Sequence, residues 1–158
     1  MSSSTPSTDP PEAFVVYTDM VADLFHAGHV AFLRSARAVA KTRSSGRPVR
    51  LVVGVVSDDD ASAYKRLPVM SSAERAIVLG ECRLVDAVVE APPVPVTSEF
   101  LRDLAADLVL HGDDMDEPEL HHWYAEAIAL GIFETVPYTH DIGGIAISTT
   151  EVIRRARQ

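Results

Sequence analysis

Cysteine is nearly absent from this chain of 158 residues, in which Cys82 stands alone. A single cysteine cannot form a disulfide within the chain, so an apolar core must stabilise the fold. A domain of about 150 residues buries roughly 70% of the surface that its unfolded chain exposes, which is sufficient without a disulfide or a structural metal. The length therefore predicts one globular domain and excludes two full ones.

Long apolar runs are also absent. No run approaches the roughly 18 residues that span a bilayer, which excludes a membrane-spanning helix. Residues 1–13 are rich in Ser, Thr and Pro, and they contain no apolar stretch typical of a secretory signal. We therefore expect a disordered tail over residues 1–13, a single domain over residues 14–158 and a cytoplasmic protein that does not bind membranes.

Positive charge is scarce: 14 Lys and Arg stand against 23 Asp and Glu, so the net charge is −9. Such a protein repels polyanions and lacks the basic surface typical of nucleic-acid binding, so we expect no nucleic-acid partner. A small anion can still bind where a few cations and backbone N–H groups converge. The local placement of such groups therefore matters more than the total charge.

Strand-like and helix-like patterns alternate along the chain. The predicted strands cover residues 14–18, 50–56, 85–89, 108–110 and 132–138, and the predicted helices cover residues 28–41, 71–82, 98–106 and 118–130, with a last helix after Ser148. This order is typical of a Rossmann-like α/β fold with three layers (α/β/α) and a five-stranded parallel sheet. Ligands bind beyond the carboxyl ends of such strands, where residues 18–29, 57–68, 111–114 and 138–150 are expected.

The first of these segments contains two histidines at a predicted helix start. His26 and His29 flank Gly28, which allows a bulky anion to approach the N–H groups of the helix. Imidazoles at this place can donate hydrogen bonds to phosphate oxygens and stabilise charge that grows during phosphoryl or nucleotidyl transfer. Two alternatives remain: a pair of helix caps, or a zinc site with a third ligand from His111, His121 or His122.

Two further segments carry weaker signals for anion binding. Ser148 to Thr150 place three hydroxyl groups at the start of the last helix, although a plain N-cap explains the same pattern. Lys65 and Arg66 follow the second predicted strand and could reach between phosphates, although adjacent basic residues are usually just solvated. All three anion signals fall on one edge of the predicted sheet, which favours a shared phosphate site.

These residues resemble the signatures of a known family. Residues 23–29 (DLFHAGH) resemble the His-x-Gly-His signature of the nucleotidyltransferases, and Ile147-Ser-Thr-Thr followed by Arg155 resembles the second signature of their cytidylyltransferase branch. The intervening segments 65–75, 84–89 and 109–114 are similar to that branch as well. The resemblance spans residues 14–157 and is nearest to phosphoethanolamine and glycerol-3-phosphate cytidylyltransferases.

The resemblance implies transfer of CMP from CTP to a small phosphorylated or phosphonate acceptor, with release of pyrophosphate, by a homodimer that uses Mg²⁺ with CTP. It implies that His26, His29 and Lys65 act on the triphosphate and its transition state. It assigns nucleotide binding to Asp23, Gly28, Arg75, Gly112, Asp113, Asp114, Ser148, Thr149, Thr150 and Arg155. Asp23 and Asp114 would lie near the nucleotide or Mg²⁺. The acceptor phosphate needs no base, because it is already an anion.

The chain departs from this branch in three places. Met20 and Ala22 replace a glycine and an aromatic residue, an arginine before Ser148 is missing, and residues 138–147 form a longer loop. Tyr138 and His140 in this loop are candidate acceptor ligands. These departures favour a small phosphonate from a natural-product pathway as the acceptor. The alternatives are phosphoethanolamine or glycerol 3-phosphate, an adenylyltransferase, and a nucleotide-binding module that has lost catalysis.

Overall fold

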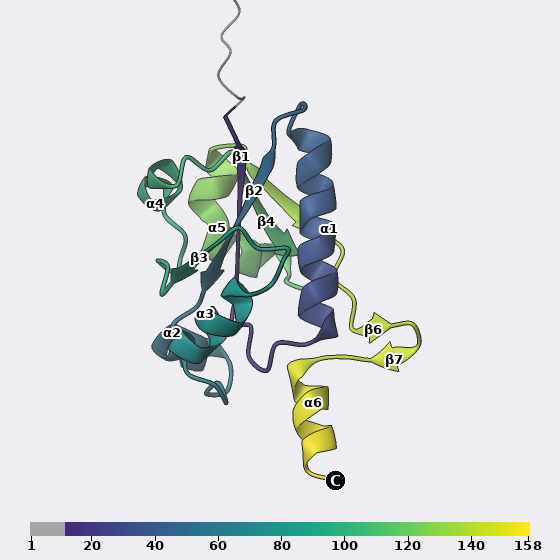
Figure 1. Ribbon diagram of the computed structural model, residues 1–158. Helices are drawn as coiled ribbons and strands as arrows, with labels where there is room; N and C mark the ends of the chain where they lie inside the picture. Colours follow the sequence, from purple (N-terminus) through teal and green to yellow (C-terminus); the bar gives the residue numbers. More distant parts are fainter. Residues whose placement is uncertain (1–11) are drawn as a thin grey trace, which may run out of the picture.

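The computed structural model describes residues 12–158, and its centre is a five-stranded parallel sheet (Figure 1). Its strands are β1 (Phe14–Met20), β2 (Val49–Val55), β3 (Ala87–Glu90), β4 (Leu108–Gly112) and β5 (Phe133–Val136). They lie in the order β3-β2-β1-β4-β5, and every neighbouring pair is parallel. The chain order reverses between β1 and β4, where doubly wound folds bind ligands. The predicted Rossmann-like fold is confirmed.

Helices cover both faces of the sheet. One face carries α1 (Ala27–Arg43) and α3 (Ser72–Gly80), and the other carries α4 (Ser98–Asp103) and α5 (Glu117–Ala129). Two short helices, α2 (Asp58–Tyr64) and α6 (Thr149–Ala156), lie at the end of the sheet where β1 and β2 finish (Figure 1). The start of α1 lies at the same end, so three helix termini meet beyond the carboxyl ends of the strands.

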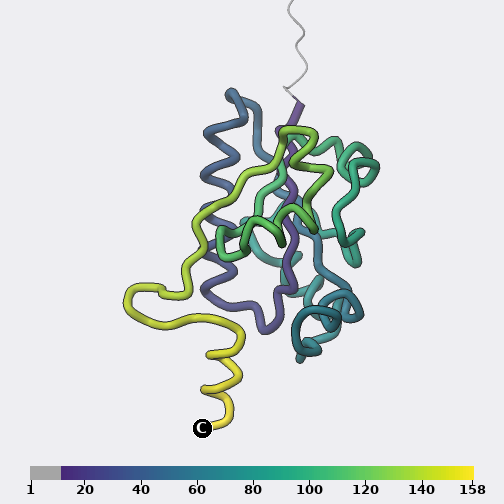
Figure 2. Tube along the Cα trace, turned by 180° about the vertical axis from the view of Figure 1, so that it is seen from behind, coloured from purple at the N-terminus to yellow at the C-terminus, as the bar shows by residue number. Residues whose placement is uncertain are grey.

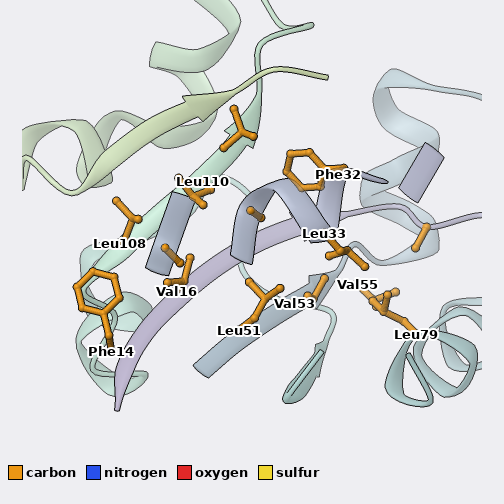
Figure 3. Close-up of a cluster of buried hydrophobic side chains, with 14 residues drawn as sticks. Phe14, Val16, Phe32, Leu33, Leu51, Val53, Val55, Leu79, Leu108 and Leu110 are labelled. Atoms are coloured by element: carbon orange, nitrogen blue, oxygen red, sulfur yellow. The ribbon is translucent and has the colours of Figure 1, made fainter. Parts of the chain in front are cut away.

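The larger core cluster lies between α1 and the sheet (Figure 3). Phe32, Leu33, Ala36 and Ala40 repeat at intervals of three or four residues and form one apolar stripe of α1. This stripe packs on inward-facing strand residues, which are Val16, Leu51, Val53, Leu108 and Leu110. Truncating a fully buried leucine of this kind to alanine costs about 2–5 kcal/mol. The packing therefore holds the start of α1, and with it His26, at a fixed place beside β1.

Two elements differ from the sequence-based prediction of loops. Helix α2 forms within the polar segment after β2, because Ser57 caps it and three aspartates occupy its first turn, where the helix dipole favours negative charge. The longer loop contains a small antiparallel hairpin of β6 (Asp141–Ile142) and β7 (Ile145–Ala146). Its turn residues, Gly143 and Gly144, adopt φ values of 62° and 83°, which glycine accepts without strain.

The chain after β5 leaves the sheet and forms an arm (Figure 2). The backbone N–H of Ile147 donates to the carbonyl of His140 (2.8 Å), which closes the base of the hairpin and leads directly to Ser148. Helix α6 contains no buried residue, and its far end points away from the domain (Figures 1 and 2). The contacts at its start therefore determine where α6 lies.

Most of the predicted disordered tail, residues 1–11, lies outside the described residues. Of the rest, Glu12 and Ala13 have carbonyl groups that each accept a hydrogen bond of 2.9 Å from the guanidinium of Arg47. Across residues 12–158, none of the helices combines the length and apolar character needed to cross a bilayer.

Candidate active site

A pocket of about 660 Å³ opens at the carboxyl ends of β1 and β4, at the predicted position. It brings together most residues that the sequence pointed to, from the loop after β1, the start of α1, the loop after α2, the end of β4 and the start of α6. These residues are Asp23, His29, Lys65, Gly112, Asp114, Tyr138, His140, Ser148, Thr149 and Thr150. Segments more than a hundred residues apart in the chain therefore share one cavity.

His26 lies directly behind the pocket wall, where its ring stacks on His29 at a centroid distance of 3.9 Å. His26 is the N-cap of α1, and its Nδ1 accepts the N–H of Gly28 at 3.0 Å. The Nδ1 of His29 in turn accepts the N–H of His26 at 3.1 Å. A β-carbon on Gly28 would lie 2.9 Å from the His26 ring, so this fold-back requires glycine. The two imidazoles are therefore helix caps, as one of the alternatives predicted.

The same hydrogen bonds fix the tautomer of both rings. A nitrogen that accepts a backbone N–H carries no proton, so each neutral imidazole holds its proton on Nε2. Nε2 of His26 lies 3.3 Å from Oγ1 of Thr149, which also bonds to the carbonyl of Asp23 at 3.2 Å. The arrangement fits a chain in which His26 donates to Thr149 and Thr149 donates to Asp23. In this arrangement the Nε2–H of His26 points to Thr149, whereas the Nε2–H of His29, which lines the pocket, is left for a ligand. The capping and phosphate hypotheses are therefore compatible.

Both histidines are held neutral. Burial, followed by the positive charges of His26 and Lys65, lowers the pKa of His29 to about 3. Burial and the nearby His140 also lower the pKa of His26. The Phe25 ring stacks on His29 with a centroid distance of 5.5 Å, which contributes to this burial. At neutral pH the pair therefore acts as two hydrogen-bond donors without net charge.

Asp23 lines the pocket, but its carboxylate is directed at the loop that carries Lys65. It accepts the N–H groups of Val69 (2.8 Å) and Met70 (3.0 Å) and pairs with Arg66 at 3.3 Å. Burial alone would raise the pKa of Asp23, but these hydrogen bonds outweigh burial and hold the pKa below its usual value. Asp23 is therefore an ionised carboxylate whose hydrogen-bonding capacity is largely used within the protein.

The expectation that Arg75 lines the nucleotide site is wrong. Its side chain is fully buried, and its guanidinium forms an ion pair with Asp58 at 2.6 Å. The other hydrogen bonds of this guanidinium go to the carbonyl groups of Val21, Val56 and Met70. In the sequence, Arg75 follows a basic loop and lies in a helix with a capping box, and this context suggested a phosphate ligand. In the fold, however, the helix turns it inward, toward the carbonyl groups of Val21, Val56 and Met70.

Three further predicted residues do not line the pocket. Gly28 packs under the His26 ring, and the carboxylate of Asp113 accepts the N–H of Tyr138 at 2.8 Å. Arg155 donates to Glu151 at 2.9 Å and to the carbonyl of Ala146 at 2.6 Å, so it supports the start of α6 from outside the pocket.

The sequence patterns did not single out Asp19, which lines the pocket at the end of β1. Its carboxylate accepts the Tyr124 hydroxyl at 2.5 Å. Burial raises the pKa of Asp19, against the opposing effects of Tyr124 and His111. Tyr64 and Trp123 also line this side, with ring centroids 5.6 Å apart. The sequence did offer one signal for this side of the pocket: Asp19 is an acidic residue at the ligand-facing end of an otherwise apolar strand.

The structure does not support the zinc alternative over residues 12–158. Residues 12–158, which include every histidine of the chain, contain no group of three or more His, Cys, Asp or Glu that could hold a metal ion. Nδ1 of His121 bonds to the carbonyl of Glu117 on α5 at 2.9 Å, and the His122 ring packs against Trp123. These two histidines therefore belong to the surface of α5.

The low pKa of His29 predicts a pH-dependent contribution to stability. Its pKa falls from 6.5 to about 3 on folding, so between pH 6.5 and 5 only the unfolded chain takes up this proton. His29 should therefore lower the free energy of unfolding by about 2 kcal/mol over that range. Urea unfolding of wild type and His29→Asn at pH 6.5 and 5 should show that the free energy of unfolding falls less in the variant than in the wild type. An equal fall in the free energy of unfolding for both proteins would contradict the prediction. As a control, this free energy should change by the same amount in both proteins between pH 7.5 and 8.5.

Comparison with known proteins shows which family this chain resembles in sequence. Residues 17–155 match the cytidylyltransferase-like family. An ethanolamine-phosphate cytidylyltransferase of Arabidopsis thaliana is 34% identical over 92% of this chain, and a probable choline-phosphate cytidylyltransferase of Schizosaccharomyces pombe is 41% identical over 70% of it. The matched regions span 33% and 29% of those relatives, so this chain corresponds to about a third of their length.

The fold is also found in a solved structure of low sequence identity. The crystal structure of the lipopolysaccharide core biosynthesis protein from Thermoplasma volcanium superposes with a TM-score of 0.61 over 81% of this chain and 99% of that one, at 22% identity. That likeness concerns the architecture alone. The sequence match extends from β1 to α6 and includes both helix starts at the pocket. The chain belongs to the cytidylyltransferase-like family.

Proposed function

We propose that this protein transfers CMP from CTP to an amino-alcohol phosphate, such as phosphoethanolamine or phosphocholine, and releases pyrophosphate. The observation that carries the proposal is the convergence of three anion-binding elements on one pocket. These are the Nε2–H of His29 at the start of α1, the hydroxyl and N–H groups at the start of α6, and the ammonium of Lys65. A triphosphate matches this arrangement in an otherwise acidic protein.

The donors can stabilise the charge that develops during transfer. The acceptor phosphate is already an anion, so it attacks the α-phosphorus of CTP in line while the bond to the bridging oxygen of pyrophosphate breaks. His26 and His29 are neutral donors fixed by the backbone, and they need no reorganisation as negative charge grows. Lys65 supplies a mobile positive charge, and Ser148 to Thr150 would hold the leaving phosphates. The departing pyrophosphate takes both electrons of the broken bond.

Magnesium fits this site as an ion held chiefly by the nucleotide. Mg²⁺ commonly uses one or two carboxylates together with substrate phosphates and water. The pocket provides Asp114 for such a contact, whereas the carboxylate of Asp23 is engaged with Val69 and Met70. We therefore assign Asp114, rather than Asp23, to an ion bound with CTP. When bound, Mg²⁺ would neutralise part of the triphosphate charge.

The acceptor head would bind on the side of the pocket that holds Asp19. A buried carboxylate flanked by Tyr64, Trp123 and Tyr124 suits an ammonium group, through charge and through contact with aromatic faces. The relatives named above carry choline phosphate or ethanolamine phosphate in their names. Glycerol 3-phosphate offers no cation to this carboxylate, so the geometry favours an amino alcohol.

With the acceptor head beside Asp19, Tyr138 and His140 are assigned to the nucleotide instead of the acceptor. His140 is close enough to His26 for its charge to lower the pKa of that imidazole, and the Tyr138 ring lies 4.9 Å from that of His140. We propose that both face the triphosphate side. The phosphonate hypothesis rested on this loop together with Met20 and Ala22, and it remains a prediction. An aminoalkyl phosphonate would present the same ammonium to Asp19 as phosphoethanolamine does.

The first prediction concerns catalysis. With phosphoethanolamine as acceptor, pyrophosphate release should require CTP rather than ATP. His29→Asn and Lys65→Ala should each lower kcat about 100-fold or more, because each removes a preorganised donor. Lys41→Ala is the matched control, since this lysine is exposed near the far end of α1. Preference for ATP would favour the adenylyltransferase, and CTP binding without turnover with any acceptor would favour the module that has lost catalysis.

The second prediction concerns the acceptor. Asp19→Asn should lower kcat/KM for phosphoethanolamine and phosphocholine at least about tenfold, because the ammonium loses its counter-charge. Since the pKa of Asp19 is raised, KM for these acceptors should rise as the pH falls through that pKa. Asp59→Asn, on the exposed side of α2, is the control. A competition that includes glycerol 3-phosphate and 2-aminoethylphosphonate ranks the alternatives, and preference for glycerol 3-phosphate would refute the ammonium subsite.

The third prediction concerns assembly. We propose a homodimer, because several large apolar side chains are exposed on the loop after α2 and on α3, notably Leu67 (69%), Val69 (62%) and Ile77 (70%). Light scattering after size-exclusion chromatography should give twice the chain mass of 17.1 kDa, and Ile77→Asp should give the monomer. Ile145→Asp changes an equally apolar exposed residue on β7 and should not alter the mass. A monomeric wild type would refute the proposal.

A further inference from the structure

The loop that carries Lys65 has no regular secondary structure. It joins α2 to α3, and Leu67 and Val69 project into solvent. At its beginning, the N–H of Lys65 bonds to the carbonyl of Ala61 at 2.9 Å, which continues α2 by one residue. Lys65 donates through a single ammonium on a long flexible stem, so its usefulness depends on where its backbone is held. The contacts that hold this loop therefore bear on the site.

Asp23 holds the far end of the loop from the side of the nucleotide site. Its carboxylate accepts the N–H groups of Val69 and Met70 and pairs with Arg66. Only 4% of this side chain is exposed. Through its carbonyl, Asp23 also accepts the Thr149 hydroxyl at the start of α6. One residue of the loop after β1 thus touches both the Lys65 loop and the second phosphate-binding helix.

Arg75 also holds the far end of the loop, through the carbonyl group of Met70. Its Nε–H donates to the carbonyl of Met70 at 3.1 Å. Its remaining bonds reach the carbonyl groups of Val21 and Val56, at the ends of β1 and β2, and the carboxylate of Asp58 in the first turn of α2. The N–H of Met70 therefore goes to Asp23 and its carbonyl goes to Arg75. Through Asp58, Arg75 also ties down the helix that precedes Lys65.

We infer that Asp23 and Arg75 form a clamp on Met70 that sets the position of Lys65, and that they are positioning residues rather than nucleotide or metal ligands. The inference rests on the proposed CMP transfer. Four of the five N–H donors of Arg75 are used inside the protein, and its side chain is fully buried, so it has no route to a phosphate. A shift of about 1 Å in a group that contacts the transition state can cost about 100-fold in rate.

The test is a double-mutant cycle that pairs each clamp residue with Lys65. Asp23→Asn keeps the shape of the side chain but loses its charge, and Arg75→Lys keeps the charge but loses the fork of donors. We expect each to lower kcat by more than about tenfold in the wild-type background. In the Lys65→Ala background each should lower kcat by less than about threefold, because the group being positioned is gone. Equal losses in both backgrounds would show a direct role and overturn the inference.

Two controls separate positioning from loss of folding. Asp59→Asn and Arg83→Lys alter exposed residues of the same types on α2 and after α3, and both should retain wild-type kcat. Melting temperatures should show every variant folded at the assay temperature, and a variant that is unfolded there is replaced by Arg66→Ala. That substitution removes the ion pair with Asp23 and a positive charge from the pocket lining. The part of its effect that comes from the ion pair should show the same dependence on Lys65. Additive effects of Arg66→Ala would also overturn the inference.

A third measurement needs no catalysis. Amide hydrogen exchange of Val69 and Met70 should be at least about tenfold faster in Asp23→Asn than in Asp59→Asn, because these N–H groups lose their charged acceptor. Unchanged exchange would refute the clamp itself. If the wild type neither binds CTP nor releases pyrophosphate, the proposed function fails, and exchange alone then decides whether Asp23 holds the loop. The two failures are therefore distinguishable.

Discussion

Two backbone N–H groups, those of Gly28 and His26, determine what the active site can do. By donating to Nδ1 of His26 and His29, they start helix α1 and fix both rings in the tautomer that carries a proton on Nε2. Burial keeps the His29 imidazole neutral, so this donor does not depend on the ambient pH near neutrality. The same two bonds thus serve the fold and the chemistry, since a helix start that was capped differently would leave the rings without a defined donor.

The proposed binding of a triphosphate to an acidic protein depends on the convergence of its hydrogen-bond donors. The reversal of strand order at β1 and β4 places two helix starts and Lys65 around one pocket. Asp23 belongs to this arrangement although it carries a negative charge, because its carboxylate is neutralised by two N–H groups and Arg66. On the opposite side, Asp19 keeps a carboxylate for a cation. The pocket is therefore divided between an anion-binding half and a half suited to an ammonium head.

Much of the architecture could be predicted from the sequence, because apolar periodicity and turn residues are local signals. The five strands, the long helices and the gathering of the Gly28 and Ser148 segments at one edge all appear as expected. Helix α2 was missed because a capped, acid-rich helix start carries no apolar periodicity. The direction of Arg75 was also missed, because charge in a sequence does not reveal which carbonyl groups lie within reach of the side chain in the fold.

The sequence by itself determined the order of elements, the family and the residue types that meet a phosphate, since spacing along the chain preserves this information. Only the tertiary structure decided how those residues divide their tasks. Asp19 lines the pocket and accepts a hydrogen bond from Tyr124, which is distant in the chain. Arg75 became an internal support, and Asp23 became the anchor of the Lys65 loop. Hydrogen-bond partners of buried polar groups are chosen by three-dimensional proximity, and a linear pattern does not contain that choice.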